Sequence, residues 1–194
     1  MRQMRSPLIP VILLLGWVVG CTGQSAIKPV EDLDVSTGVT LGSLKEPIEL
    51  LPNAQATAVV TRKRVSFAYM GPVEWNRSGT LSYGLWIHIA PGTGAQPGDI
   101  RASSALILVL DDGPLVLSTI EAPKLGRSPY QEAASWGQTA YFDLNVDMLK
   151  AMAASRKFEL DVRAADGSTL IYSPSQDTRS TLTQYLQARG LTAD

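Results

Sequence analysis

The sequence predicts an α+β domain, a mainly antiparallel β sheet or sandwich with two C-terminal helices packed on it. Several short segments alternate apolar and polar side chains, which is the pattern of half-buried strands. Two Asp-Gly pairs join apolar segments and favour tight hairpins. Helical patterns are confined to the last fifty residues, and helices gathered after a run of strands are typical of this class. We expect one globular domain over residues 38–194.

The first half of this domain is expected to form strands. Val39–Leu41 and Ile48–Leu51 are short β-type segments, read as a strand pair. The main sheet is expected to begin in residues 58–70 and to break at the Gly71-Pro72 pair. In residues 81–90 one strand face carries Tyr83, Leu85, Ile87 and Ile89, and the other carries Gly84, Trp86, His88 and Ala90.

A hairpin is expected at the Asp111-Asp112-Gly113 turn. Leu106–Leu110, which precedes it, is continuously apolar and is expected to be covered on both faces. Residues 121–135 read as a long polar loop. The next strand, near residues 136–144, is expected to place Trp136, Ala140 and Phe142 on one side.

Two helices flank a second hairpin at the C-terminal end. Asn145 can cap the first helix. The hairpin turns at Asp166-Gly167, after a strand with Phe158, Leu160 and Val162 on one face. The last helix is expected to begin with a capping box of Ser173 and Gln176, to end at Gly190, and to dock through Leu182, Tyr185 and Leu186.

The N-terminal segment is typical of a secretory signal peptide. It has a positive start with Arg2 and Arg5, followed by an uncharged apolar run over residues 8–20. The alternative is an uncleaved anchor helix. A spanning helix needs about 20 apolar residues, however, and this run is shorter and contains Pro10.

The end of that run resembles a bacterial lipobox. The matching residues are Val18, Val19, Gly20 and Cys21, and Cys21 is the only cysteine of the chain. The resemblance implies that residues 1–20 are a lipoprotein signal peptide, cut before an acylated Cys21. It also implies an outer-membrane location facing the periplasm, because Thr22 replaces the Asp that favours inner-membrane retention. Residues 21–37 are small, polar and aperiodic, and are expected to be a flexible tether.

Composition excludes some classes of function. Removing residues 1–20 takes away Arg2 and Arg5 and leaves 15 basic and 18 acidic residues, a net charge of −3. This charge argues against a nucleic-acid partner, because such domains are usually basic. With Cys21 committed to lipid and a single histidine, we expect no zinc site. No other metal and no cofactor are expected.

Two readings remain open for one aromatic-rich stretch, residues 73–89. Glu74, Trp75, Arg77, Trp86 and His88 are candidates for a binding face, since Trp and Arg dominate binding hot spots. Ordinary core packing is the favoured alternative, because Tyr83 and Trp86 have opposite strand parity. His88 has no recognisable catalytic partner motif, and no Gly-x-Ser-x-Gly elbow occurs, so we expect no catalytic residues.

The body resembles small uncharacterised envelope lipoproteins of Gram-negative bacteria. The resemblance is carried by "STGVTLGSL", by "EWNRSGTLSYGLW" and by the helix–hairpin–helix end. It implies no activity. The resulting hypothesis is a membrane-anchored, non-catalytic module that binds an envelope protein or glycan. The alternatives are a hydrolase acting on envelope polymers and a carrier of an apolar ligand.

Overall fold

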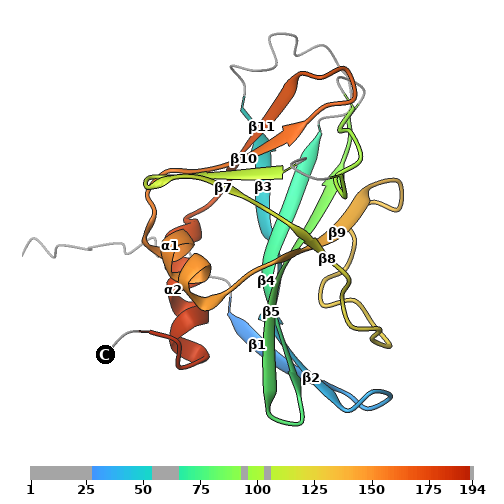
Figure 1. The fold of residues 1–194 in the computed structure, drawn as a ribbon, viewed down its shortest axis with the longest axis vertical. Helices are drawn as coiled ribbons and strands as arrows, with labels where there is room; N and C mark the ends of the chain where they lie inside the picture. Colours follow the sequence, from blue (N-terminus) through green and yellow to red (C-terminus); the bar gives the residue numbers. More distant parts are fainter. Residues whose placement is uncertain (1–27, 54–65, 93–95, 103–105, 193–194) are drawn as a thin grey trace, which may run out of the picture.

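The expected α+β class is confirmed. The computed structural model describes residues 28–53, 66–92, 96–102 and 106–192. In these residues a curled antiparallel sheet forms a half-barrel, and two helices pack on it (Figure 1).

Eleven strands form one sheet within the described residues. The strands of the first half are β1 (Pro29–Asp34), β2 (Val39–Leu44), β3 (Ile48–Pro52), β4 (Phe67–Arg77) and β5 (Thr80–Ala90). Those of the second half are β6 (Leu106–Leu110), β7 (Gly113–Val116), β8 (Thr119–Ile120), β9 (Gln138–Asp143), β10 (Phe158–Arg163) and β11 (Thr169–Pro174). Their order is β7-β6-β10-β11-β3-β4-β5-β9-β8, and β2 joins β1 to β4.

Strand β4 is the centre of the sheet, and it runs through the pair at which we expected a break. One edge of β4 pairs with β5 along its whole length. The other edge pairs with β3 over residues 68–70 and with β2 over residues 73–77. Pro72, which has no N–H to donate, therefore lies where this edge passes from β3 to β2 and no ladder hydrogen bond is needed.

Both Asp-Gly hairpins are confirmed. Strands β6 and β7 pair across the turn at residues 111–112, and β10 and β11 pair across the second turn. Along β10 the expected apolar face is buried, with Phe158, Leu160 and Val162 inside. Strand β6 differs in part, because Ile107 and Val109 are only half-buried. Trp136 lies outside β9 and is 57 % exposed.

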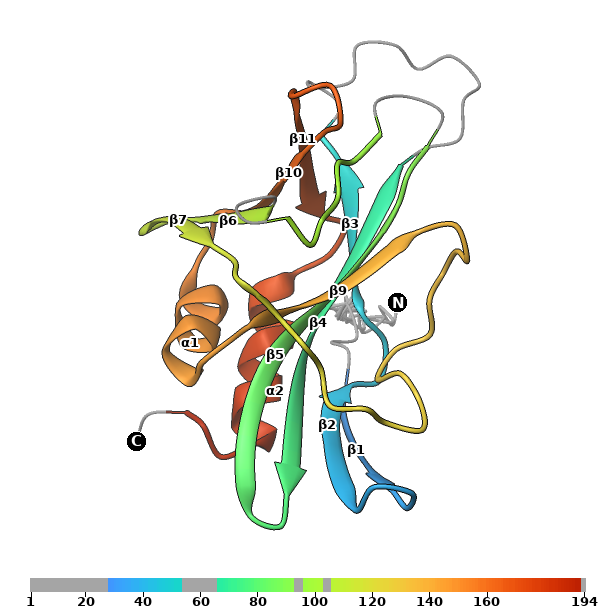
Figure 2. The same cartoon turned by 45° about the vertical axis from the view of Figure 1, so that its right-hand side comes forward.

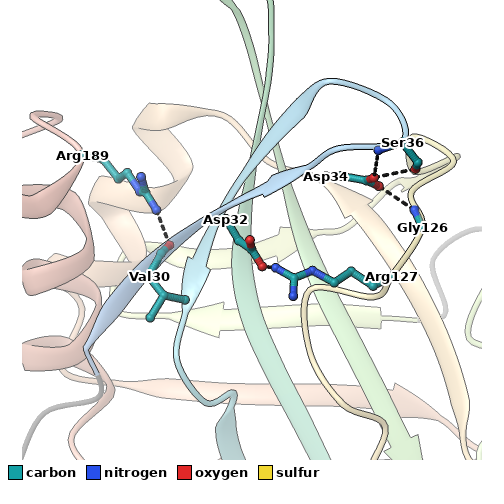
Figure 3. A network of polar contacts seen from close by, with 7 residues as sticks. All are labelled: Val30, Asp32, Asp34, Ser36, Gly126, Arg127 and Arg189. Atoms are coloured by element: carbon teal, nitrogen blue, oxygen red, sulfur yellow. Dashed lines mark hydrogen bonds and ion pairs between the residues drawn. The ribbon is translucent and has the colours of Figure 1, made fainter.

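The tether expected over residues 21–37 is wrong for its second half. Pro29–Asp34 form β1, which pairs along its full length with Val39–Leu44. Strands β2 and β3 form as expected, but they pair with β4 and not with each other. The sequence of β1, "PVEDLD", carries no local strand signal. Residues from distant segments of the chain hold this strand in place instead (Figure 3). Residues 1–27 lie outside the described residues.

The two helices are α1 (Val146–Ala154) and α2 (Thr178–Ala188). Asn145 caps α1 as expected, accepting a hydrogen bond from Met148 N at 2.8 Å. The start expected for α2 is wrong: Ser173 and Pro174 belong to β11, and Asp177 is the N-cap. The expected end is confirmed, since Gly190 has a φ of 64°.

The long β4–β5 hairpin is covered on both sides, which buries every residue of β5 from Gly84 to Ala90. The helices lie on one side of this hairpin (Figures 1 and 2), where Leu182, Tyr185 and Leu186 join the core. We call this side, which carries Gly42, Glu74 and Tyr83, the helix face. No helix in the described part of the chain is long and apolar enough to cross a membrane.

Candidate functional site

The opposite side of the hairpin, the loop face, carries Trp75, Trp86 and His88. Trp86 stacks on His88 with ring centroids 5.8 Å apart, and Tyr130 packs on Trp86 at 5.0 Å. Tyr130 comes from the polar segment between β8 and β9. A side chain at Gly71 would collide with it, because an added Cβ would lie 2.3 Å from its hydroxyl oxygen. Gly71 therefore lets residues 121–137 lie directly on the sheet.

The Tyr130 hydroxyl closes the gap in the sheet beside Pro72. It donates to the Pro72 carbonyl at 2.8 Å and accepts from Leu44 N at 3.1 Å. Burial raises the pKa of this hydroxyl far above its usual range. The phenol therefore stays neutral and remains able to donate to Pro72.

A short chain of hydrogen bonds leads from the buried His88 to the surface. Thr139 Oγ1 donates to Glu132 Oε1 at 2.7 Å and lies 2.8 Å from His88 Nδ1. The threonine hydroxyl has one proton and gives it to the carboxylate, so it accepts from a protonated Nδ1. Because burial lowers the pKa of His88 and favours its neutral form, the second ring nitrogen, Nε2, is then bare. That Nε2 is buried and has no hydrogen-bond partner among the described residues.

The same chain ends at an open cleft beside β9. The cleft has a volume of about 660 Å³. We call it the β9 cleft, and its wall consists of Arg101, Thr119, Ile120, Glu121, Ala122, Ser128, Glu132, Thr139, Ala140 and Tyr141. Arg101 is fixed to this wall, because its Nη2 donates to the Thr139 carbonyl at 2.9 Å. The β9 cleft is thus lined by both basic and acidic side chains.

Burial sets the protonation of two side chains at this site. It lowers the pKa of His88 below its ordinary value, against the opposing effect of the Glu132 charge. It also raises the pKa of Tyr141, and a hydrogen bond from Ser128 acts in the opposite sense. Tyr141 therefore presents a neutral phenol to the cleft, beside the side chains of Arg101, Glu121 and Glu132.

This geometry suits binding better than catalysis. A general base must reach the proton that it removes. His88 is 0 % exposed, and one ring nitrogen is already bonded to Thr139. Gly137 covers the other nitrogen, since a Cβ added to Gly137 would lie 2.5 Å from Nε2. The histidine thus holds Thr139 and Glu132 in position from inside the fold.

The five residues suggested as a binding face do not form one. Trp75, Trp86 and His88 are buried on the loop face. Glu74 is also buried, but it lies on the helix face opposite Tyr83. Only Arg77 of the five is exposed. The structure agrees with the alternative of core packing, because covering both sides of the hairpin encloses these aromatic side chains.

Sequence reasoning missed the residues that build the cleft. Glu132 and Ser128 belong to a stretch predicted only as a polar loop, and Arg101 lies in a turn before β6 for which no role was predicted. The local sequence carries no signal for their meeting with β9. A weak sign was available in Thr139, which shares a strand face with Tyr141 where a buried strand would carry apolar side chains.

Two acidic residues outside the cleft accept hydrogen bonds from backbone N–H groups. Asp34 accepts hydrogen bonds from Ser36 N and Gly126 N, at 2.9 and 2.5 Å. Asp111 accepts from Arg156 N and Lys157 N, at 2.6 and 3.0 Å. Within the ranges that the structure describes, no cluster of three or more His, Cys, Asp or Glu could hold a metal ion. Cys21 lies outside those ranges.

Comparison of the chain with protein-family models, with curated proteins and with solved structures finds no match.

Proposed function

We propose that the chain is a membrane-anchored envelope lipoprotein whose β-rich domain is a non-catalytic binding module. The anchor is an acylated Cys21, and the location is the periplasmic side of the outer membrane. Both follow from the resemblance of residues 18–21 to a lipobox. Two or three acyl chains on one cysteine exceed the threshold for stable anchoring.

The observation that carries the binding role is the β9 cleft. Its charged groups are held in position, Glu132 by Thr139 and Arg101 by the Thr139 carbonyl. Fixed polar groups cost less entropy when a ligand binds, which is the general advantage of a preorganised site. A mainly apolar hollow that carries both signs of charge at fixed positions suits an envelope protein or glycan.

The test uses the full-length chain in its native cells. A photo-crosslinking amino acid is placed at Ser128, in the cleft, or at Asp112, an exposed control in the β6–β7 turn. We expect Ser128 to capture a protein or glycan adduct that Asp112 does not. Arg101→Ala in the Ser128 background should reduce that adduct several-fold. Identical adducts from both positions, or no effect of Arg101→Ala, would refute the cleft as the binding site.

A further inference from the structure

Exposed apolar side chains gather at one end of the molecule. Single exposed apolar residues are ordinary on a protein surface, so their clustering is the informative feature. Seven large hydrophobic side chains are exposed among the described residues, and three lie near the β1–β2 and β4–β5 turns. These three are Leu33, Val35 and Leu81. Val35 is 88 % exposed.

The strand register places two leucines on one face. Leu33 pairs with Thr40, Thr40 with Asn76, and Asn76 with Leu81, so the four residues form one row across four strands. Directly paired residues project to the same side of a sheet. The neighbouring row, which contains Gly42 and Glu74, is the one that Arg189 covers at the end of α2. The leucine row therefore lies beyond the end of the helix.

We call Leu33, Val35 and Leu81 the β1 tip. Figures 1 and 2 show that the β1–β2 turn and the β4–β5 turn both lie at the lower end of the long axis. The β10–β11 turn lies toward the opposite end. The tip is thus an extremity of the domain.

Polar contacts hold β1 in place, as Figure 3 shows. Arg189 Nη2 donates to the Val30 carbonyl at 2.6 Å. Arg127 forms an ion pair with Asp32, and Asp34 accepts from Gly126 N. These contacts fix β1, and the ion pairs of Asp32 with Arg127 and of Glu31 with Arg189 offset two of the negative charges that anionic lipids would repel.

The chain that precedes β1 limits the distance between the domain and its anchor. Seven residues, 22–28, separate Cys21 from Pro29, so eight residue steps join the two. At most about 3.6 Å per residue, they reach no more than about 29 Å. Strand β1 spans about 20 Å at about 3.3 Å per residue. The anchor can therefore lie level with the β1 tip.

We propose that the β1 tip rests in the headgroup layer of the membrane that holds Cys21. This inference rests on the proposed lipid anchor. The tip is aliphatic and lacks the aromatic side chains that dominate protein hot spots. Apolar side chains at a membrane surface add binding energy to that of the acyl chains.

Depth-dependent fluorescence quenching tests this placement with the full acylated protein. Acylation occupies the only native cysteine, so Val35→Cys can be labelled with a fluorophore at one site. Asp166→Cys, in the exposed β10–β11 turn, is the matched control. In vesicles of phosphatidylethanolamine and phosphatidylglycerol with brominated acyl chains, we expect at least threefold stronger quenching at position 35. Leu81→Asp should at least halve that difference.

Equal quenching at both positions overturns the proposal, and so does quenching at position 35 that Leu81→Asp leaves unchanged. A label that is shielded only after envelope proteins are added indicates a protein partner and also overturns it. Incorporation of a tagged fatty acid separates the two claims. Acylated protein with an unquenched tip refutes only the tip contact, whereas protein that takes up no fatty acid refutes the anchor and the tip contact together.

Discussion

Arg189, the residue that ends α2, is hydrogen-bonded to the backbone of Val30, 159 positions earlier in the chain. Its Nη2 donates to the Val30 carbonyl at 2.6 Å, and its Nη1 lies 3.2 Å from Glu31 Oε1. The guanidinium also stands 5.7 Å from the centroid of the Tyr185 ring. A Cβ at Gly42 would collide with it. One side chain therefore joins the last helix to the first strand.

Arg189→Ala is expected to loosen β1 and to lower the free energy of unfolding by about 1.5–3 kcal/mol, the range for a hydrogen bond to a charged group. Arg179→Ala, at an exposed position of the same helix, is the control and should change it by less than about 0.5 kcal/mol. Urea denaturation measures both. Hydrogen exchange should show faster exchange of β1 amides only in the Arg189 variant. Unchanged protection of β1 would show that Arg189 does not hold it.

Removing β1 is expected to destabilise the domain. A chain that begins at Gly38 loses the six residue pairs between β1 and β2 and uncovers the edge of β2. We expect its melting temperature to fall by at least about 5 °C relative to a chain that begins at Lys28, because about 1 kcal/mol corresponds to about 2–4 °C at this size. Calorimetry measures the difference. Equal melting temperatures would mean that residues 28–37 are a tether after all.

Docking of α2 is expected to depend on Leu186, which is 4 % exposed. Leu186→Ala should lower the free energy of unfolding by about 2–5 kcal/mol, through lost transfer energy and the cavity left behind. Gln187→Ala, at the next and exposed position, is the control. Urea denaturation of the two variants gives the comparison. A loss below about 0.5 kcal/mol for Leu186→Ala would indicate a helix that is free in solution.

Stability should fall in mild acid because of His88. The pKa of this buried histidine is lower in the folded chain than its ordinary value of 6.5. Between those two values the unfolded chain binds more protons, so stability rises with pH. The contribution is complete above pH 6.5 and is lost as pH falls toward the folded-state pKa. His88→Asn, which keeps an N–H for Thr139, should flatten the dependence between pH 5 and 7. Parallel urea stability curves for the two proteins would contradict this origin.

The parts of the fold that are local in sequence could be predicted. The two Asp-Gly hairpins, the Asn145 cap and the buried face of β10 each depend on residues within one short segment. Strand β1 could not be predicted, because Arg189 and Arg127 stabilise it from far along the chain. The predicted start of α2 is wrong because Ser173 and Pro174 match a helix-capping pattern but also suit the end of a strand. In the structure they end β11.

The candidate site depends on the same kind of long-range contact. The chain of hydrogen bonds joins Glu132 in a loop to Thr139 on β9 and to His88 on β5, 51 residues before Thr139. The polar composition of residues 121–135 predicted a surface loop. Nothing in that composition predicted which strand the loop would cover. The aromatic residues near His88 suggested a binding face, because composition alone does not distinguish an exposed aromatic cluster from one that is buried on both sides of the sheet.

The mass of the protein extracted from cell membranes tests most directly whether Cys21 anchors this domain. The mature chain is expected to lack residues 1–20 and to exceed the mass of residues 21–194 by two or three acyl chains with their glyceryl linkage. Fragmentation should place the added mass on Cys21, and Cys21→Ser should abolish both the cleavage and the addition. A chain that retains residues 1–20, or one that begins at an unmodified Cys21, would contradict the lipid anchor.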